Sequence, residues 1–198
     1  MTIKNVNQRV GVFVDVANMY YSAKNLYNAN VNFGKVLELA VSSRQLIRTI
    51  AYTIRAEMPK EQAFFDALMK EGFEVKAKDI QIFPGGAKKG DWDVGIAIDA
   101  VKLADRLDTV VLVTGDGDYV PLVTYLQENK GCLVEAIAFG KSASSKLKEA
   151  VDDFMDLDIN PKPFLLNADK QKPRFNTHRN IAAVKENKDI PETTEIGN

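Results

Sequence analysis

The sequence has very few of the residues that form disulfides or bind zinc. Cys132 is its one cysteine and His178 its one histidine, so the chain cannot form an internal disulfide or assemble the usual cysteine and histidine zinc cluster. Because His178 lies by itself in a polar region late in the sequence, a Ser-His-Asp triad is also a poor fit. A metal bound by this chain must therefore rely on oxygen ligands.

Long apolar runs and a basic excess are missing too. Residues 1–9 are polar and the first apolar stretch is interrupted at Asp15, so we expect neither a signal peptide nor a membrane span and predict a cytoplasmic protein. Lysine and arginine number 26 against 27 aspartate and glutamate, which gives a formal net charge of -1. This balance excludes strong nonspecific attraction to nucleic acid, so any nucleic-acid contact must be local.

Several motifs of phosphate and ester chemistry are also absent. The sequence contains no Walker A motif, no G-x-G-x-x-G after its first predicted strand and no G-x-S-x-G. A phosphatase of the haloacid dehalogenase type needs a second aspartate two residues after its nucleophile, and Ala17 stands at that position after Asp15. These absences argue against a nucleotide-binding loop, a serine hydrolase and that phosphatase mechanism.

What is present is the composition of a folded domain with a polar tail. Apolar residues make up 45% and charged residues 27% of the 198 residues, which is typical of a soluble globular protein. We predict one domain over residues 1–158. Residues 159–198 are rich in proline and polar residues with little periodicity, so we expect a tail that is extended or is docked on the domain through residues 164–166.

Strand and helix patterns alternate along the domain. Short β-branched runs predict strands, and apolar residues at helical spacing predict helices. The predicted strands span residues 10–16, 47–54, 73–83, 110–113 and 133–139. The predicted helices span residues 31–41, 59–72, 91–107, 119–129 and 144–155. Repeated βα units imply a three-layer α/β/α sandwich around a mostly parallel, five-stranded sheet with the first strand at its centre.

Acidic residues gather where the predicted strands end. Asp15 follows the first strand, Asp116 and Asp118 follow the fourth, and Asp93 begins the helix after the third. Because ligands of open α/β sheets bind at the carboxyl ends of the strands, we expect these four carboxylates to converge. A cluster of like charges is costly unless cations occupy it, and oxygen ligands suit Mg²⁺ or Mn²⁺. Such a site typically activates water and shields an attacked phosphate.

Neighbouring polar residues have both a functional and a structural interpretation. Asn18 either contacts substrate or holds the loop beside Asp15, and Thr114 either orients water or satisfies backbone groups. Lys88 and Lys89 either meet backbone phosphates or form a solvated loop. The sequence leaves these alternatives open.

Two of the acids and two neighbouring aromatic residues also have an ordinary structural explanation. Asp15 at a strand end can cap or turn the chain, and Asp118 precedes a helix as an N-cap candidate. Trp92 and Tyr119 are expected to pack rather than to stack on bases. For the two aspartates we favour the functional interpretation.

Asp93 and Asp99 compete for the same role because both lie on the helix predicted over residues 91–107. Six residues apart, they point about 120° away from one another, so one ion can hardly bind both. Asp93 lies in the first turn, where the positive end of the helix dipole favours a carboxylate. We predict that Asp93 binds metal and that Asp99 is a supporting acid bonded to Asn18 or to a loop amide.

Four stretches, in this order on the predicted elements, carry a family resemblance. They are Phe13–Asn18, Lys89–Asp99, Thr114–Tyr119, and Ser144 and Leu147 with Val151–Phe154. Together they resemble the NYN domain, a branch of the PIN-like nuclease superfamily, and within it the LabA-like bacterial group. The resemblance covers about residues 8–158. Thr114, Tyr119 and Val151 stand where serine, phenylalanine and alanine are usual, and no acid is lost.

The resemblance implies a Rossmann-like, PIN-like sheet and metal-dependent cleavage of RNA. It carries catalytic and metal-binding roles onto Asp15, Asp93, Asp116 and Asp118. The candidate substrate contacts are Asn18, Lys89, Thr114 and Ser144.

The leading hypothesis is thus a Mg²⁺- or Mn²⁺-dependent ribonuclease acting on single-stranded or structured RNA. The alternatives are a noncatalytic RNA- or nucleotide-binding regulatory module of the same fold and a phosphatase of small phosphomonoesters. The sequence leaves open whether the chain forms a homo-oligomer.

Overall fold

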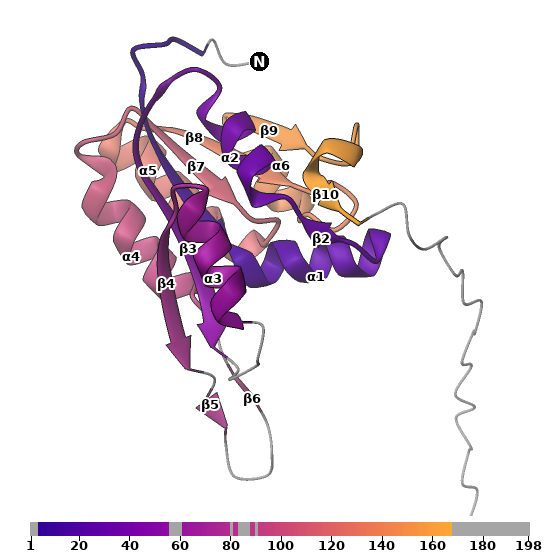
Figure 1. The fold of residues 1–198 in the computed structure, drawn as a ribbon. Helices are drawn as coiled ribbons and strands as arrows, with labels where there is room; N and C mark the ends of the chain where they lie inside the picture. The colour runs from indigo at the N-terminus through magenta and orange to yellow at the C-terminus, as the bar shows by residue number, and fades with distance from the viewer. Residues whose placement is uncertain (1–3, 56–60, 80, 83–87, 90, 168–198) are drawn as a thin grey trace, which may run out of the picture.

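A parallel sheet forms the centre of the computed structural model, which describes residues 4–55, 61–79, 81–82, 88–89 and 91–167, with only the backbone at 81–82 and 88–89. Its strand order is β4-β3-β1-β7-β8-β9, and every neighbouring pair is parallel (Figure 1). The strands are β1 Arg9–Asp15, β3 Gln45–Arg55, β4 Glu74–Asp79, β7 Thr109–Val113, β8 Leu133–Ala138 and β9 Asp153–Asp156. The apolar β-branched runs form the strands that are buried on both faces, as parallel sheets require.

The α/β class is confirmed, but the sheet has six strands where the sequence predicts five. The helix predicted over residues 144–155 is only α6, Ser145–Ala150, because the backbone at Val151 turns extended. Residues 153–156 then pair with β8 as β9. Four half-buried residues give too short a pattern to identify a strand by alternation, which is why the sequence signal missed it.

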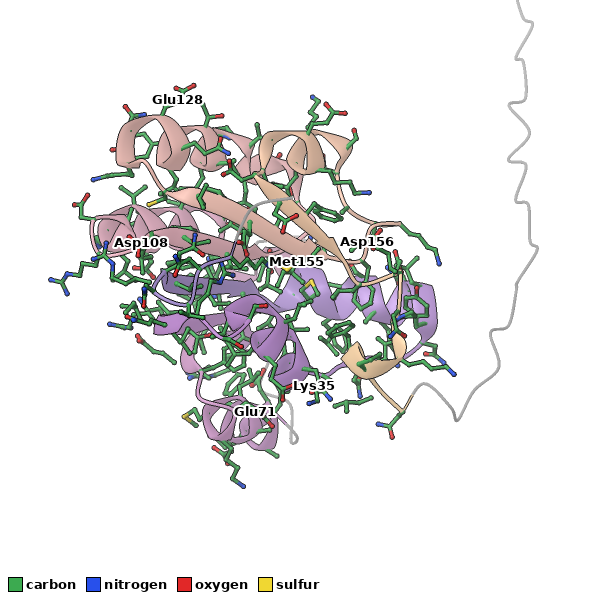
Figure 2. The ribbon with its side chains drawn as sticks, turned by 90° about the horizontal axis from the view of Figure 1, so that it is seen from above. Lys35, Glu71, Asp108, Glu128, Met155 and Asp156 are labelled. Carbon is green, nitrogen blue, oxygen red and sulfur yellow. The ribbon has the colours of Figure 1, made fainter. Side chains whose placement is uncertain are left out.

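Helices cover both faces of the sheet. On one face lie α1 Val16–Tyr27, α2 Phe33–Val41 and α3 Glu61–Lys70, packed on the side chains of Val10, Val12 and Val14. On the other face lie α4 Asp93–Ala104, α5 Val120–Lys130 and α6, packed on Phe13 and its neighbours. Figure 2 shows the two layers, with Glu128 of α5 on one outer side and Glu71, just after α3, on the other. The three-layer sandwich is therefore confirmed.

The helix α1 has no counterpart among the predicted helices. Its sequence, VANMYYSAKNLY, follows the valine run of β1 without a break, and its buried residues are Val16, Met19 and Ala23. Because Asp15 ends the strand and also caps the helix, no turn residue separates the two patterns.

The topology has a switch point between β1 and β7. From β1 the chain builds β3 and β4 on one side, and then returns to build β7, β8 and β9 on the other. Open α/β sheets bind ligands at such a point, outside the carboxyl ends of the strands. The helix α1, the short 3-10 helix η1 Gly117–Tyr119 and α4 begin near this edge.

Smaller elements complete the described chain. β2 Asn30–Val31 pairs antiparallel with β10 Leu165–Leu166, which follows the 3-10 helix η2 Lys162–Phe164, and Leu165 is buried against the core. β5 Gln81–Ile82 pairs with β6 Lys88–Lys89, so the strand predicted over residues 73–83 divides into β4 and β5. Within the described residues, no helix is long and apolar enough to cross a membrane.

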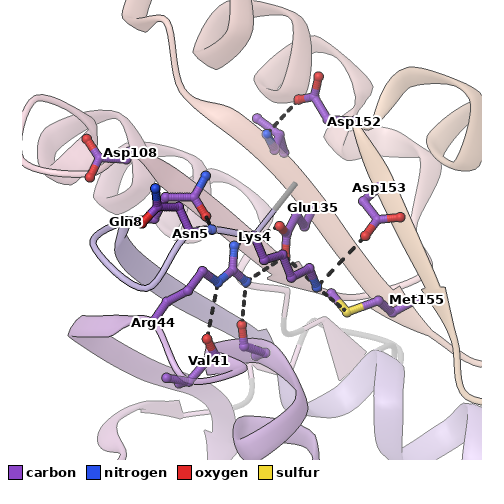
Figure 3. A network of polar contacts seen from close by, with 12 residues as sticks. Lys4, Asn5, Gln8, Val41, Arg44, Asp108, Glu135, Asp152, Asp153 and Met155 are labelled. Carbon is purple, nitrogen blue, oxygen red and sulfur yellow. Dashed lines mark hydrogen bonds and ion pairs between the residues drawn. The ribbon is translucent and has the colours of Figure 1, made fainter. Parts of the chain in front are cut away.

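Arg44 and Glu135 form a buried ion pair away from the acidic edge of the sheet (Figure 3). Arg44, just before β3, donates to both carboxylate oxygens of Glu135 on β8 at 2.8 Å, and neither side chain is exposed. Arg44 also donates to the carbonyls of Val41 and Ala40. The pair joins the end of α2 to the middle of the sheet, and the Lys4 ammonium lies 3.5 Å from Glu135.

Candidate metal centre at the carboxyl ends of β1 and β7

Asp15 is the most enclosed acid of the site. It ends β1 beside Tyr52 of β3, and its carboxylate accepts the backbone N–H of Asn18 at 3.0 Å as the N-cap of α1. Burial raises the pKa of Asp15 to about 6, helped by the nearby charges of Asp93 and Asp116, although the hydrogen bond from Asn18 works in the other direction. The fold therefore holds a carboxylate where its negative charge is disfavoured.

The loop after β7 holds Asp116 in place by its own hydrogen bonds. The Asp116 carboxylate accepts the backbone N–H of Asp118 at 3.0 Å, while its own N–H donates to Thr114 Oγ1 at 3.2 Å. From α1, Asn18 Oδ1 accepts the N–H of Gly115 at 2.9 Å. Asn18 and Thr114, candidates for substrate contact from the sequence, thus use their side-chain oxygens to fix this loop.

Asp93 approaches the same place from the other side as the first residue of α4. Its carboxylate accepts the hydroxyl of Tyr119 at 3.1 Å. Burial raises the pKa of Asp93, and the charges of Asp116 and Asp118 add to that rise, while the Tyr119 hydrogen bond opposes it. Tyr119 is buried, and its hydroxyl holds an acid that also faces other acids.

The structure brings Asp93, Asp116 and Asp118 together. One carboxylate oxygen from each lies within 4.8 Å of the others; Asp93 and Asp116 are half-buried and Asp118 is exposed. A small divalent ion with oxygen ligands at about 2.1 Å places those oxygens roughly 3 to 4.2 Å apart, so this spacing fits such an ion with small side-chain adjustments. Asp15, the fourth acid predicted to converge, is not in this group, but it lies close enough for the charges of Asp93 and Asp116 to raise its pKa.

Asp99 lies outside this group and has other partners. Its carboxylate accepts the Tyr52 hydroxyl at 2.9 Å and the Lys76 ammonium at 2.7 Å. Burial alone would raise the pKa of Asp99, but these two hydrogen bonds outweigh it and lower the pKa. The predicted hydrogen bond to Asn18 or a loop amide is wrong, because the Asn18 oxygen is directed to Gly115 and Asp99 faces β3 and β4.

Ser144 packs directly on the glycine-rich loop. Its N–H donates to the Gly115 carbonyl at 2.8 Å, and a Cβ added at Gly117 would lie 2.6 Å from Ser144 Oγ. A Cβ at Gly115 would meet the Ala143 backbone at 3.0 Å. A larger residue at Gly117 would therefore require the Ser144 hydroxyl to move, and one at Gly115 would require a small shift of the Ala143 backbone.

Two aromatic residues and one lysine complete the site's surroundings. The Tyr119 hydroxyl is a site contact that the sequence interpretation missed; a tyrosine directly after the acidic run was the available signal. Trp92 packs as expected, donating Nε1–H to the Thr53 carbonyl at 2.7 Å with the Lys78 ammonium over its ring. The backbone of Lys89 lies in β6, and its side chain is outside what the structure describes.

Comparisons with known proteins find a matching family model, a similar protein and a similar crystal structure. A family model described as the NYN domain matches residues 9–158. The "Low amplitude and bright protein LabA" of Synechococcus elongatus is 25% identical over 175 residues, covering 83% of this chain and 91% of the relative. The crystal structure of a protein of unknown function, VPA0982 from Vibrio parahaemolyticus, superposes with a TM-score of 0.75 at 32% identity, covering 83% of this chain and all of that one.

Proposed function

Because the chain belongs to the NYN domain family, we propose that it is a Mg²⁺- or Mn²⁺-dependent ribonuclease that hydrolyses RNA phosphodiester bonds. The observation that carries this proposal is the trio of Asp93, Asp116 and Asp118 at the switch point of the sheet. Ligands of this class of fold bind at that edge. NYN domains are in general nucleases, so the family and the acidic site favour the same chemistry.

The donor set suits a hard divalent cation. Asp93, Asp116 and Asp118 would hold the ion, and the carboxylate of Asp15 would add a further negative charge near them. A bound cation supplies Lewis acidity toward water and toward a phosphodiester oxygen. The chain itself supplies orientation, since the Tyr119 hydroxyl fixes Asp93 and the Asp118 amide fixes Asp116.

The residues around the acids would position the RNA. Asn18 and Thr114 keep the loop of Gly115 and Asp116 rigid, which holds the acids at one spacing as the substrate enters. Lys89 and Ser144 remain our candidates for contacts to the RNA backbone. The balanced net charge agrees with a local contact of this kind rather than a broad basic surface.

The test is cleavage of labelled single-stranded and structured RNA with Mn²⁺, with Mg²⁺ and with EDTA. We expect cleavage that EDTA stops and that Asp116→Asn slows by about a hundredfold or more, because a carboxylate ligand worth several kcal/mol is lost. Asparagine is also a good cap, so the variant retains an acceptor for the Asp118 amide and removes mainly the charge.

Asp66→Asn is the matched control. Asp66 is exposed on α3, and its carboxylate accepts a hydrogen bond from Gln62, which an amide oxygen can replace. We expect this variant to cleave as the unchanged protein does. RNA that stays intact under every metal condition, with binding that survives Asp116→Asn, would instead support the noncatalytic RNA- or nucleotide-binding module.

A further inference from the structure

The helix that Asp15 caps carries a pair of exposed tyrosines. Tyr20 is 42% and Tyr21 63% exposed, and among the described residues Tyr21 is the most exposed aromatic side chain. Their ring centroids are 5.4 Å apart with the planes 74° apart, an edge-to-face contact. Such a contact favours this arrangement of the two rings and leaves aromatic surface open to solvent.

These tyrosines lie on the helix that begins at the acidic site. Tyr21 comes six residues after Asp15, about 9 Å along the axis at a rise of roughly 1.5 Å per residue. Asn18, which holds the Gly115 amide, lies one turn before Tyr21 on the same side of α1. Figure 1 shows α1 leading away from the carboxyl ends of the strands, so a ligand that enters the acidic site can continue along this helix.

The surface of α1 is suited to a polyanion although the site itself is acidic. The chain has 27 acids, yet none lies between Asp15 and Glu38. Lys24 lies on α1 one turn after Tyr20 and Tyr21. Lys141 lies near the end of α1 with its ammonium over the ring of Tyr27, 5.5 Å from its centroid. The helix itself therefore carries no negative side chain, and the acid at its far end is Asp158, whose carboxylate accepts the Tyr27 hydroxyl.

We propose that Tyr20 and Tyr21 form a base-stacking platform that selects unpaired RNA for the acidic site. Exposed aromatic rings bind single strands because every base has a π face, whereas the bases of a duplex are already stacked on one another. The platform rests on the proposed ribonuclease function and names its substrate class, single-stranded RNA. It differs from Trp92 and Tyr119, whose polar atoms bond within the protein.

The test measures binding of a fluorescein-labelled oligouridine and of a blunt RNA duplex of equal length by anisotropy. The Asp116→Asn variant with Mg²⁺ serves as the background, so that the strands stay intact. Four variants are made in this background. They are Tyr21→Ala, Tyr21→Phe, the double change of Tyr20 and Tyr21 to alanine, and Tyr125→Ala. Tyr125 is 40% exposed on α5 and is the matched control. Melting curves verify that each variant is folded.

We expect the background protein to prefer the single strand. Tyr21→Ala should weaken that binding about tenfold, in the range measured for base and aromatic stacking, and the double change should weaken it further. Tyr21→Phe, which keeps the ring, should bind as the background does, and Tyr125→Ala should change affinity less than twofold. A strand with abasic sites should bind weakly to the background and lose nothing more in Tyr21→Ala.

The outcomes separate the platform from the catalytic proposal. Equal affinity of Tyr21→Ala and the background for the single strand, or a preference for duplex, overturns the platform even if the unchanged protein cleaves RNA. Ring-dependent binding of a strand that the unchanged protein leaves intact with Mn²⁺ supports the platform and overturns the ribonuclease. If the double alanine variant does not fold, Tyr21→Ala with Tyr21→Phe still decides the question.

Discussion

Replacing Asp15 with asparagine should stabilise the metal-free protein at neutral pH. The fold encloses this carboxylate and places it near Asp93 and Asp116, so its charge is held where it is disfavoured. Asparagine has nearly the same shape, and its oxygen can still accept the Asn18 amide that caps α1. The change therefore removes a charge and keeps the local hydrogen bond.

The size of the effect comes from the pKa of Asp15. The ordinary value is 3.8 and the folded protein raises it to about 6, a difference worth about 3 kcal/mol. Below about pH 4 the group is protonated in both states and costs nothing. Between about pH 4 and 6 the unfolded chain loses the proton first, so the free energy of unfolding falls as pH rises, and the full cost is present above about pH 6.

Melting curves in EDTA at pH 4 and pH 7.5 measure this cost. For a chain of this size, about 3 kcal/mol corresponds to a rise in Tm of roughly 6 to 12 °C in Asp15→Asn at pH 7.5, with little change at pH 4. The control Asp66→Asn should move Tm little at either pH. Mn²⁺ should raise the Tm of the unchanged protein more than that of Asp15→Asn. An equal gain at both pH values, or a loss at pH 7.5, would refute the electrostatic reasoning.

Four further substitutions test other contacts. Tyr119→Phe removes the hydroxyl that holds Asp93 and should weaken Mn²⁺ binding up to about tenfold by calorimetry in a folded protein; unchanged affinity would contradict this role. Asp93→Asn should abolish metal-dependent cleavage with little change in Tm, whereas Asp99→Asn should lower stability by about 1 to 3 kcal/mol and keep cleavage; the reverse pattern would exchange their roles. Glu135→Gln leaves Arg44 buried without its anion and should cost about 3 to 5 kcal/mol in urea unfolding, and a loss below about 1 kcal/mol would show that the pair is dispensable.

Much of the fold could be predicted from the sequence because the strands are strongly patterned. The runs before Asp15 and before Thr114 are apolar and β-branched, and they form the buried strands on either side of the switch point. α1 and β9 could not be predicted in this way. The first continues a strand without a turn residue, and the second is four half-buried residues whose strand character depends on pairing with β8.

The acids of the site could be predicted from the sequence, but the contacts that hold them could not. The loop after β7 and the start of α4 lie at one edge of the sheet, so the topology brings Asp93, Asp116 and Asp118 together, whereas Asp15, the fourth predicted acid, is not in that group. The Tyr119 hydroxyl on Asp93 and the Lys76 ammonium on Asp99 depend on side-chain directions between elements distant in the chain. Periodicity carries no information about such directions, so these contacts need the folded structure.

The most direct test of the ribonuclease site is a Mn²⁺ titration that follows metal binding and RNA cleavage in the same samples. Bound Mn²⁺ is measured by electron paramagnetic resonance, and cleavage is measured on a labelled single strand. We expect cleavage to rise in proportion to bound Mn²⁺, and we expect both to be lost in Asp116→Asn and kept in Asp66→Asn. Cleavage that persists in EDTA or in Asp116→Asn, or saturated Mn²⁺ binding with intact RNA, would contradict this expectation.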